Sequence, residues 1–393
     1  MHEVADFLNP TMPDPILTLA DRPVVVIFSG GDAPGMNACL RALTRLGINR
    51  HGVPMLVVRN GYKGLVDASR EARTAEGLAA LKHRIESTTG RYGLIDRNQQ
   101  MILMDHGAVS AIVRIGGIIT GSARCLDFHE PAVRAEAITL LKNLNARGLI
   151  VCGGNGSLAG AELIAKESGL RVVGIPATID NDLNFTEMAL GVDTALNTVA
   201  NVVDNFKDTA KSHRRVMVLE TMGRASGELA RLAAVASGAE MVVTPKRPLT
   251  DADVRKLAET LATGMRQGRS HAIVLVAEGV NFEPEVSRNR AYVLADAFKA
   301  YFSETHDLAD LEIRPSVLGH LQRGGDASPQ DAILAARFAD AAMRELLSYN
   351  GRSGVTALQH GRVTIVDYDA PDISDREALK ADMDELHLIL SSW

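Results

Sequence analysis

Short apolar runs alternate with longer amphipathic stretches along most of this chain. Residues 24–28, 56–58, 149–151, 172–175, 216–219 and 272–276 form brief apolar runs, rich in β-branched residues, and most soon meet a Gly or Pro. Such runs are typical of buried strands. The stretches 36–46, 158–166, 194–209 and 255–265 show a helical pattern. The alternation predicts an α/β fold, in which helices cover both faces of a mostly parallel sheet.

Two segments stand apart from this pattern. The first 20 residues are acidic and interrupted by prolines, and they predict an N-terminal arm. Residues 66–105 are polar, charged and punctuated by glycines, so we expect a surface excursion with a helical piece near residues 75–85. No internal repeat or clear linker divides the chain. We therefore expect two interleaved lobes rather than separate domains in a row.

The composition narrows the functional classes. The chain has 393 residues, 46% of them hydrophobic, and a net charge of −6, which argues against nucleic acid as the main partner. The three cysteines are too few and too scattered for a disulfide framework, and no pair has the spacing of metal ligands, so we expect reduced thiols at Cys39, Cys125 and Cys152. The N-terminus lacks the regions of a signal peptide, and no apolar run reaches the roughly 18 residues that span a bilayer. We therefore expect a cytoplasmic protein without membrane contact.

Two glycine-rich turns follow predicted strands. Residues 29–37 read SGGDAPGMN and residues 153–157 read GGNGS, each before a predicted helix. Glycines let the backbone approach a phosphate, and a helix N-terminus offers free N–H groups to it. One such turn is as often a simple strand–helix connection. Two in one sheet predict a polyphosphate that lies across neighbouring strand ends.

Carboxylates and arginines supply further candidate chemistry. Asp180 and Asp182 follow another strand, where one can accept a hydroxyl proton while the other faces a metal ion; an Asx turn is the competing interpretation. Arginines near predicted strand ends would suit a phosphorylated substrate, because guanidinium binds phosphate with two hydrogen bonds. They are Arg124, Arg214, Arg215, Arg224, Arg314 and Arg323, with His320 beside the last.

These motifs together resemble the phosphofructokinase family. SGGDAPGMN, GGNGS, PATIDND, SHRR, ETMGR, AEG and VLGHLQRGG occur in the family's order, from about residue 24 to 337. The resemblance implies two interleaved Rossmann-like lobes. The larger, donor-binding lobe would hold residues 21–191 plus about 322–372. The smaller, sugar-phosphate-binding lobe would hold residues 192–321 plus about 373–393.

The resemblance also implies roles for individual residues. Asp180 resembles the general base for the 1-hydroxyl of fructose 6-phosphate, with Thr178 beside it, and Arg224 resembles the group that stabilises charge during transfer. The substrate-binding positions would be Arg215, Met222, Gly223, Glu278, Arg314, His320 and Arg323. The nucleotide-phosphate positions would be Gly31, Arg124, Cys125, Gly156 and Ser157. Asp182 and Asn155 would serve Mg²⁺. Since the family supplies some pocket residues from a neighbouring subunit, we expect a homo-oligomer, either dimer or tetramer, with shared active sites.

Several positions leave alternatives open. The pyrophosphate-using branch usually has Asp at the position of Gly156 and Lys at the position of Ala177, so the small residues here favour ATP. Arg59, however, occupies a position where an aromatic residue often packs against adenine. Asn155 replaces the usual magnesium-binding Asp, which raises the alternative of a weakly catalytic or non-catalytic sugar-phosphate sensor. Sedoheptulose 7-phosphate is an alternative acceptor. Arg41 and Arg45 match effector-binding positions, and a solvated basic helix face explains them equally well.

Overall fold

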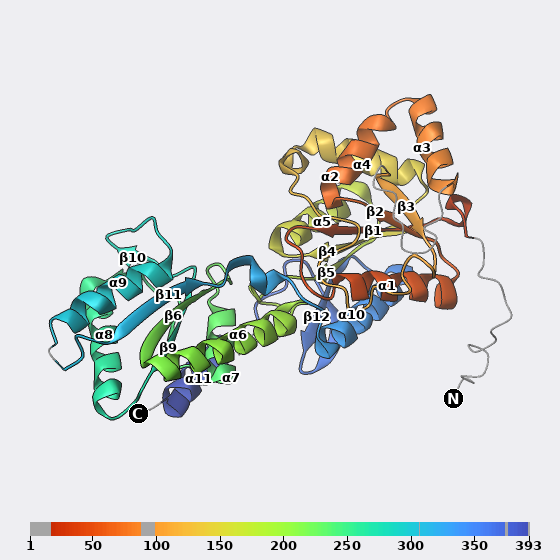
Figure 1. The fold of residues 1–393 in the computed structure, drawn as a ribbon. Coiled ribbons are helices and arrows are strands. Elements are labelled where there is room, and N and C mark those ends of the chain that lie inside the picture. Colours follow the sequence, from red (N-terminus) through yellow and green to blue (C-terminus); the bar gives the residue numbers. More distant parts are fainter. Residues whose placement is uncertain (1–16, 88–98, 306, 374–375, 392–393) are drawn as a thin grey trace, which may run out of the picture.

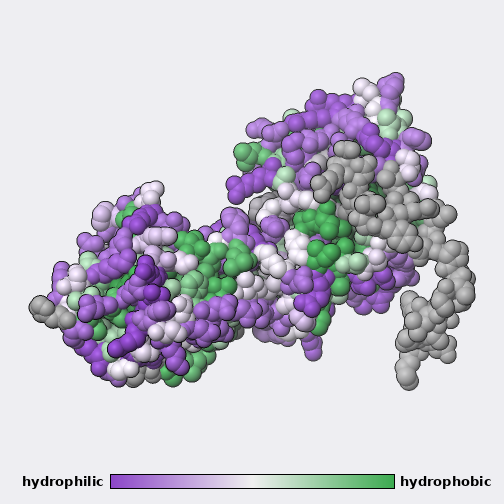
Figure 2. Space-filling view, in the orientation of Figure 1, coloured by the Kyte–Doolittle hydropathy of each residue, from purple (hydrophilic) through white to green (hydrophobic). Residues whose placement is uncertain are grey.

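The computed structural model describes residues 17–87, 99–305, 307–373 and 376–391. Figure 1 shows two α/β lobes, each built around its own sheet, with the long helix α6 (Val192–His213) beginning near the junction between them. In the view of Figure 2, polar side chains cover most of the outer surface of both lobes, as the amphipathic pattern of the helices predicts. Among the described ranges, no helix is both long and apolar enough to cross a membrane.

The larger lobe holds a seven-stranded sheet with the order β13-β12-β5-β4-β1-β2-β3. Its strands are β1 (Val24–Ser29), β2 (Met55–Val58), β3 (Met101–Met104), β4 (Gly148–Gly153), β5 (Val172–Pro176), β12 (Gly354–Gln359) and β13 (Arg362–Val366). The five inner strands are parallel, while β3 and β13 pair antiparallel at the two edges. The carboxyl ends of β1, β4 and β5 therefore lie side by side.

Helices cover both faces of this sheet because β1 is apolar on both sides. Val24, Val26 and Phe28 pack with α1 (Met36–Leu46) and α10 (Pro329–Leu347). Val25 and Ile27 pack with the opposite layer. That layer contains α2 (Gly61–Glu71), α3 (Ala75–Ser87), α4 (Pro131–Asn143) and α5 (Asn155–Ser168). A strand buried on both faces reads as a continuous apolar run, which is why the sequence pattern located it.

The smaller lobe holds a four-stranded parallel sheet with the order β11-β6-β9-β7. Its strands are β6 (Arg215–Thr221), β7 (Met241–Val243), β9 (Ala272–Ala277) and β11 (Glu312–Val317). One face packs against α8 (Asp251–Arg266) and α9 (Arg290–Ser303), and the other against α6 and α7 (Glu228–Ser237). A short pair, β8 (Leu249–Thr250) with β10 (Phe282–Glu283), and α11 (Arg376–Ser391), which packs on α7, complete the lobe.

The chain passes between the lobes at several places. It leaves β5 for α6, returns from β11 through the 3-10 turn η6 (Gly319–Arg323) to α10, and leaves β13 for α11. One apolar core, which includes Phe28 of β1 and Leu219 of β6, continues from one sheet to the other. We propose the lobe boundaries given above, residues 21–191 plus about 322–372 and residues 192–321 plus about 373–393. The remaining 3-10 and π turns are η2 (Leu19–Asp21), η3 (Gly47–His51) and η5 (Leu126–His129).

The α/β prediction is confirmed, and the interpretation of residues 66–105 is wrong in part. Val66, Leu81 and Ile85 are buried, and Met101–Met104 forms the fully buried edge strand β3. The polar residues around these positions concealed an apolar run only four residues long. Residues 88–98, and residues 1–16 of the expected N-terminal arm, lie outside the described residues.

Candidate active site

A cleft of about 530 Å³ lies at the carboxyl ends of strands from both sheets. Loops after β1, β4 and β5 of the larger lobe line it, together with the ends of β6 and β9 and the turn η6 of the smaller lobe. Ligands of open α/β sheets bind at such strand ends. Most predicted site residues line this cleft: Gly31, Arg124, Cys125, Asn155, Gly156, Ser157, Thr178, Asp180, Asp182, Met222, Arg224, Glu278, His320 and Arg323.

Close contacts explain two glycines of the predicted phosphate loops, Gly153 and Gly31. A Cβ atom on Gly153 would lie 2.3 Å from the carbonyl oxygen of Ser29, so only glycine fits where the two loops touch. A Cβ atom on Gly31 would lie 2.9 Å from Nη1 of Arg323. Helix α5 begins at Asn155 and directs its free N–H groups toward the same cleft. This side of the cleft is therefore built for an anionic, phosphate-bearing group.

The sequence did not single out Asp32, Tyr62 and His129, which also line the cleft. The Tyr62 hydroxyl donates a hydrogen bond of 2.7 Å to the carbonyl oxygen of Ser157, and its ring stacks on Phe128 at 4.2 Å. Burial raises the pKa of Tyr62 well above its ordinary value. Tyr62 thus supports the phosphate loop, a role that depends on the approach of its side chain to the first turn of α5 and has no local sequence signal.

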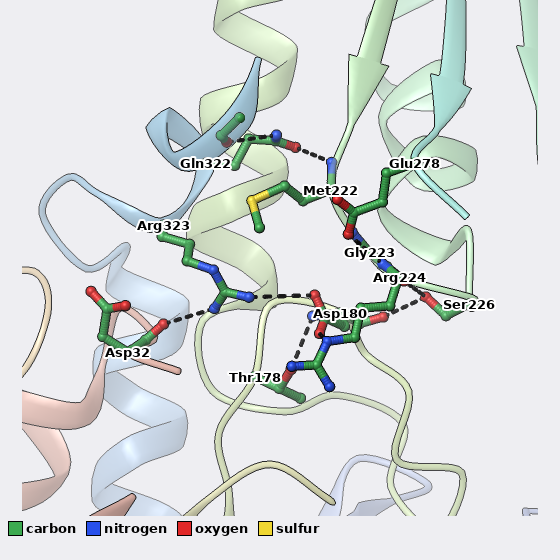
Figure 3. A network of polar contacts seen from close by, with 11 residues as sticks. Asp32, Thr178, Asp180, Met222, Gly223, Arg224, Ser226, Glu278, Gln322 and Arg323 are labelled. Atoms are coloured by element: carbon green, nitrogen blue, oxygen red, sulfur yellow. Dashed lines mark hydrogen bonds and ion pairs between the residues drawn. The ribbon is translucent and has the colours of Figure 1, made fainter. Parts of the chain in front are cut away.

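Asp180 lies at the centre of the cleft, between cations from two segments (Figure 3). Its side chain is only 2% exposed, with Oδ2 3.2 Å from Nε of Arg224 and Oδ1 3.9 Å from Nη2 of Arg323. The backbone N–H of Asp180 donates to the Thr178 hydroxyl at 3.1 Å, and the Ser226 hydroxyl donates to the Asp180 carbonyl at 2.7 Å. These bonds fix the turn that carries the carboxylate.

The surroundings of Asp180 raise the pKa of its carboxyl group. Burial raises the pKa of Asp180 above its ordinary value of 3.8, and the charges of Asp182 and Glu278 raise it further, whereas Arg323 and Arg224 lower it. Burial is the largest of these effects: it outweighs Arg323, which lies 3.9 Å from the carboxylate, and Arg224, which is 61% exposed and whose charge water screens. A carboxylate with a raised pKa accepts a proton more readily than a free one, which suits a general base.

The loop after β6 forms the opposite wall of the cleft. Oε1 of Glu278 accepts hydrogen bonds from the backbone N–H groups of Arg224 at 2.8 Å and Gly223 at 3.2 Å. Gly223 has φ of 125° and Arg224 has φ of 46°, both in the left-handed region. Glu278 therefore holds a strained loop and, with it, the Arg224 side chain beside Asp180. Gly223 itself contributes backbone geometry and is not among the residues that line the cleft.

Two predicted substrate-binding residues lie apart from this cleft. Arg215 on β6 and Arg314 on the edge strand β11 both pair with the carboxylate of Glu312 on the same sheet. Neither is among the residues that line the cleft. The side chain of Arg314 is 57% exposed and Glu312 is 36% exposed, so the pair lies at the surface of the smaller lobe.

The cleft carries ligands of the kind that a magnesium ion uses. Oδ1 of Asp180 is buried without a hydrogen-bond partner, and Asp182 and Asn155 line the same space with oxygen atoms. No group of three or more His, Cys, Asp or Glu in the described part of the chain forms a closed metal site. Mg²⁺ needs only one or two carboxylates, because phosphates and water complete its shell. The residues therefore fit this ion, with Asn155 as a neutral ligand.

The comparison with known families agrees with this geometry. The family model described as Phosphofructokinase matches residues 23–346, more than half of the chain. The chain belongs to the phosphofructokinase family. The prediction made from the motifs is thus confirmed.

Individual members of the family match this chain over most of its length. This phosphofructokinase is 36% identical over 348 residues to ATP-dependent 6-phosphofructokinase 1 of Clostridium perfringens, covering 88% of this chain and 93% of that protein. It is 35% identical over 374 residues to the ATP-dependent 6-phosphofructokinase of Halothermothrix orenii, covering 94% and 99%. The phosphofructokinase of Pichia pastoris in the T-state has a TM-score of 0.73 and 26% identity, covering 98% of this chain and 40% of that one. This chain thus spans less than half of the fungal chain.

Proposed function

We propose that this phosphofructokinase transfers the γ-phosphoryl group of ATP to the 1-hydroxyl of fructose 6-phosphate, giving fructose 1,6-bisphosphate. The observation that carries the proposal is the position of Asp180, buried between the phosphate loops on one side and Arg224, Glu278 and His320 on the other. A proton acceptor there lies between a donor phosphate and a sugar hydroxyl. The two bacterial relatives described above are named as ATP-dependent 6-phosphofructokinases.

The residues of the cleft suggest how the transfer proceeds. The 1-hydroxyl oxygen of the sugar forms a bond to the γ-phosphorus while the bond from that phosphorus to the β–γ bridging oxygen breaks, and ADP leaves. Asp180 accepts the hydroxyl proton, with its turn fixed by Thr178. Arg224, which is exposed enough to move from Asp180 to the phosphoryl group, stabilises the developing charge. Asp182 and Asn155 would hold magnesium, which supplies charge neutralisation of the phosphates.

The donor side of the cleft supports ATP over pyrophosphate. No atom lies within 4 Å of a Cβ placed on Gly156, so this position leaves open space at the phosphate loop. Ala177 lines the cleft with a methyl group where a cation would contact a small anionic donor. The space that these small residues leave accommodates the extended chain of a nucleoside triphosphate.

The test is a donor-by-acceptor activity matrix. We expect ADP formation that requires fructose 6-phosphate and Mg²⁺, with little turnover when pyrophosphate replaces ATP. Sedoheptulose 7-phosphate as a second acceptor tests the sugar specificity. Turnover with pyrophosphate but not with ATP would refute the donor assignment, and the absence of turnover with every donor would refute the enzymatic proposal.

We also propose a homo-oligomer in which Arg215 and Arg314 of one copy complete the sugar-phosphate pocket of another. Their position on the neighbouring strands β6 and β11 of the smaller lobe, outside the cleft, supports this arrangement. Mixing Asp180→Asn with Arg314→Ala protomers tests it, because each is inactive alone while a hybrid dimer contains one intact site. Random mixing of dimers should restore about a quarter of the wild-type activity. Hybrids that stay inactive would show that the arginines act within their own chain.

We propose a cytoplasmic setting for the reaction. Cys39, Cys125 and Cys152 are free thiols, and thiols persist in reducing compartments. Fractionation of cells that express the full chain, with activity assayed in each fraction, tests the setting. Activity confined to a membrane or secreted fraction would contradict it.

A further inference from the structure

Gln322 is a buried amide between the two walls of the acceptor side of the cleft. Its side chain is fully buried, although the flanking residues of η6 are partly or fully exposed. Oε1 accepts a hydrogen bond of 3.1 Å from the backbone N–H of Met222, and Nε2 donates a hydrogen bond of 2.9 Å to the carbonyl oxygen of Gly319 (Figure 3). The acceptor thus bonds to a residue 100 positions earlier in the chain, while the donor bonds within the turn that carries Gln322.

Each partner of Gln322 belongs to a segment that forms the cleft. Met222 is the first residue after β6 and begins the loop that carries Arg224 beside Asp180. Gly319 opens the turn η6, from which His320 and Arg323 line the cleft. In a 3-10 turn, residues three apart lie on the same side, so His320 and Arg323 point together while Gln322 points elsewhere.

The turn η6 has a second attachment in the other lobe. Nη1 of Arg323 donates to the carbonyl oxygen of Asp32 at 3.1 Å, in the loop after β1. The backbone N–H of Leu318 donates to the carbonyl oxygen of Glu220 at 3.0 Å, which ties the start of the turn to β6. Gln322 lies between these two attachments. Its amide therefore determines how the turn is oriented against the Met222 loop.

We propose that Gln322 is a positioning residue for the sugar phosphate: it keeps the cationic turn of His320 and Arg323 in fixed register with the loop of Met222 and Arg224. The inference rests on the proposed function, since fructose 6-phosphate is the ligand assigned to this side. Loss of the amide leaves the buried N–H of Met222 and carbonyl of Gly319 without these partners and lets the two walls shift. The Gln322 amide bonds to Met222 and Gly319, whereas the turn reaches the donor loop after β1 through Arg323, so the donor side should change less than the acceptor side.

The test compares Gln322→Met, which has a similar shape but cannot replace either hydrogen bond, with Gln330→Met. Gln330 is exposed on α10, where its amide approaches only the sulfur of Met188, so it is a matched control. We expect Gln322→Met to raise the KM for fructose 6-phosphate, and its dissociation constant in calorimetry, about tenfold, or about 1.4 kcal/mol. The KM for ATP should change less than twofold, and Gln330→Met should match wild type.

A second variant keeps the proposal testable if Gln322→Met does not fold. Gln322→Asn keeps the amide donor and acceptor on a side chain one methylene shorter, which cannot span both partners, so it should give a smaller, still acceptor-selective rise in KM. Equal rises in both KM values, or a lower melting temperature with neither KM changed, would overturn the inference and leave a purely structural role. Wild-type enzyme is assayed in parallel: if it shows no turnover, the proposed function fails, whereas active wild type with unchanged Gln322 variants refutes only the positioning role.

Discussion

Replacing Asp180 with Asn should greatly reduce activity and at the same time stabilise the fold. The Asp180 side chain is 2% exposed, and burial raises its pKa. At neutral pH the ionised carboxylate therefore lowers the stability of the fold relative to a neutral side chain of the same shape. The compensating ion pairs are weak: the Arg224 guanidinium is 61% exposed, and such pairs contribute about 0–1 kcal/mol, while Arg323 lies 3.9 Å from the carboxylate. Asn keeps the shape and removes the charge. We expect a gain in unfolding free energy of about 0.5–2 kcal/mol.

The activity of the same variant should fall by about 10²–10⁴-fold, the usual contribution of a general base. Differential scanning fluorimetry measures the first effect and a coupled ADP assay the second. Thr198→Val, on the polar side of α6, controls for loss of a polar group outside the cleft. A melting temperature below that of wild type at neutral pH would refute the electrostatic argument. Activity that survives would refute the assignment of the base.

The sign of the pH dependence provides an independent check. The pKa of Asp180 is raised in the folded state. Such a carboxyl group destabilises the fold when it is ionised, and the effect is complete at pH values above the raised pKa. As the pH falls through it, wild-type Asp180 becomes neutral, and the stability advantage of Asp180→Asn should shrink. The acid limb of kcat/KM in wild type should lie above pH 3.8, the ordinary value, because the base must be ionised. An advantage that grows on acidification would contradict the sign.

The remaining predictions concern the phosphate loops. Gly153→Ala should destabilise the fold by about 1–3 kcal/mol and raise the KM for ATP, because its Cβ would lie 2.3 Å from the Ser29 carbonyl; thermal melting and kinetics measure both. Asn155→Asp should lower the Mg²⁺ concentration needed for half-maximal activity by about tenfold, because a carboxylate replaces a neutral amide; a magnesium titration at fixed ATP measures this. The Gly156→Asp variant should fold normally, because the space around a side chain at this position is open. It should raise the KM for ATP, because it places an anion in the cleft; unchanged kinetics would show that the phosphates of ATP bind elsewhere.

The pattern of buried residues determines which helices and strands could be predicted from the sequence. The run at residues 272–276 lies within β9, and 36–46 coincides with α1, because both elements bury apolar residues in the regular spacing of their type. Strand β11, with the sequence EIRPSV, was not predicted, since it is a half-buried edge strand with a proline and two charged residues. Strand β7 has only three residues and gives too short a pattern.

The candidate site divides in a similar way. The glycine loops and the Asp180 turn could be found because their chemistry is local, with the required residues adjacent in the chain. Gln322, Ser226 and Tyr62 could not, because their hydrogen-bond partners lie 100, 46 and 95 residues away. The amide of Gln322 was visible in the motif GHLQRGG, but only the fold shows that it bonds to the loop after β6.

The repeated passage of the chain between the lobes has a consequence for how the protein can be divided. Neither sheet with its covering helices corresponds to one continuous stretch: β12 and β13 of the larger lobe follow β11 of the smaller one, and α11 then returns to α7. A gene split at any one crossing would therefore yield two fragments that each contain incomplete pieces of a hydrophobic core. Cleavage of the folded protein at a single crossing would leave the lobes linked by the other connections. We expect such a nicked protein to remain assembled until it is denatured.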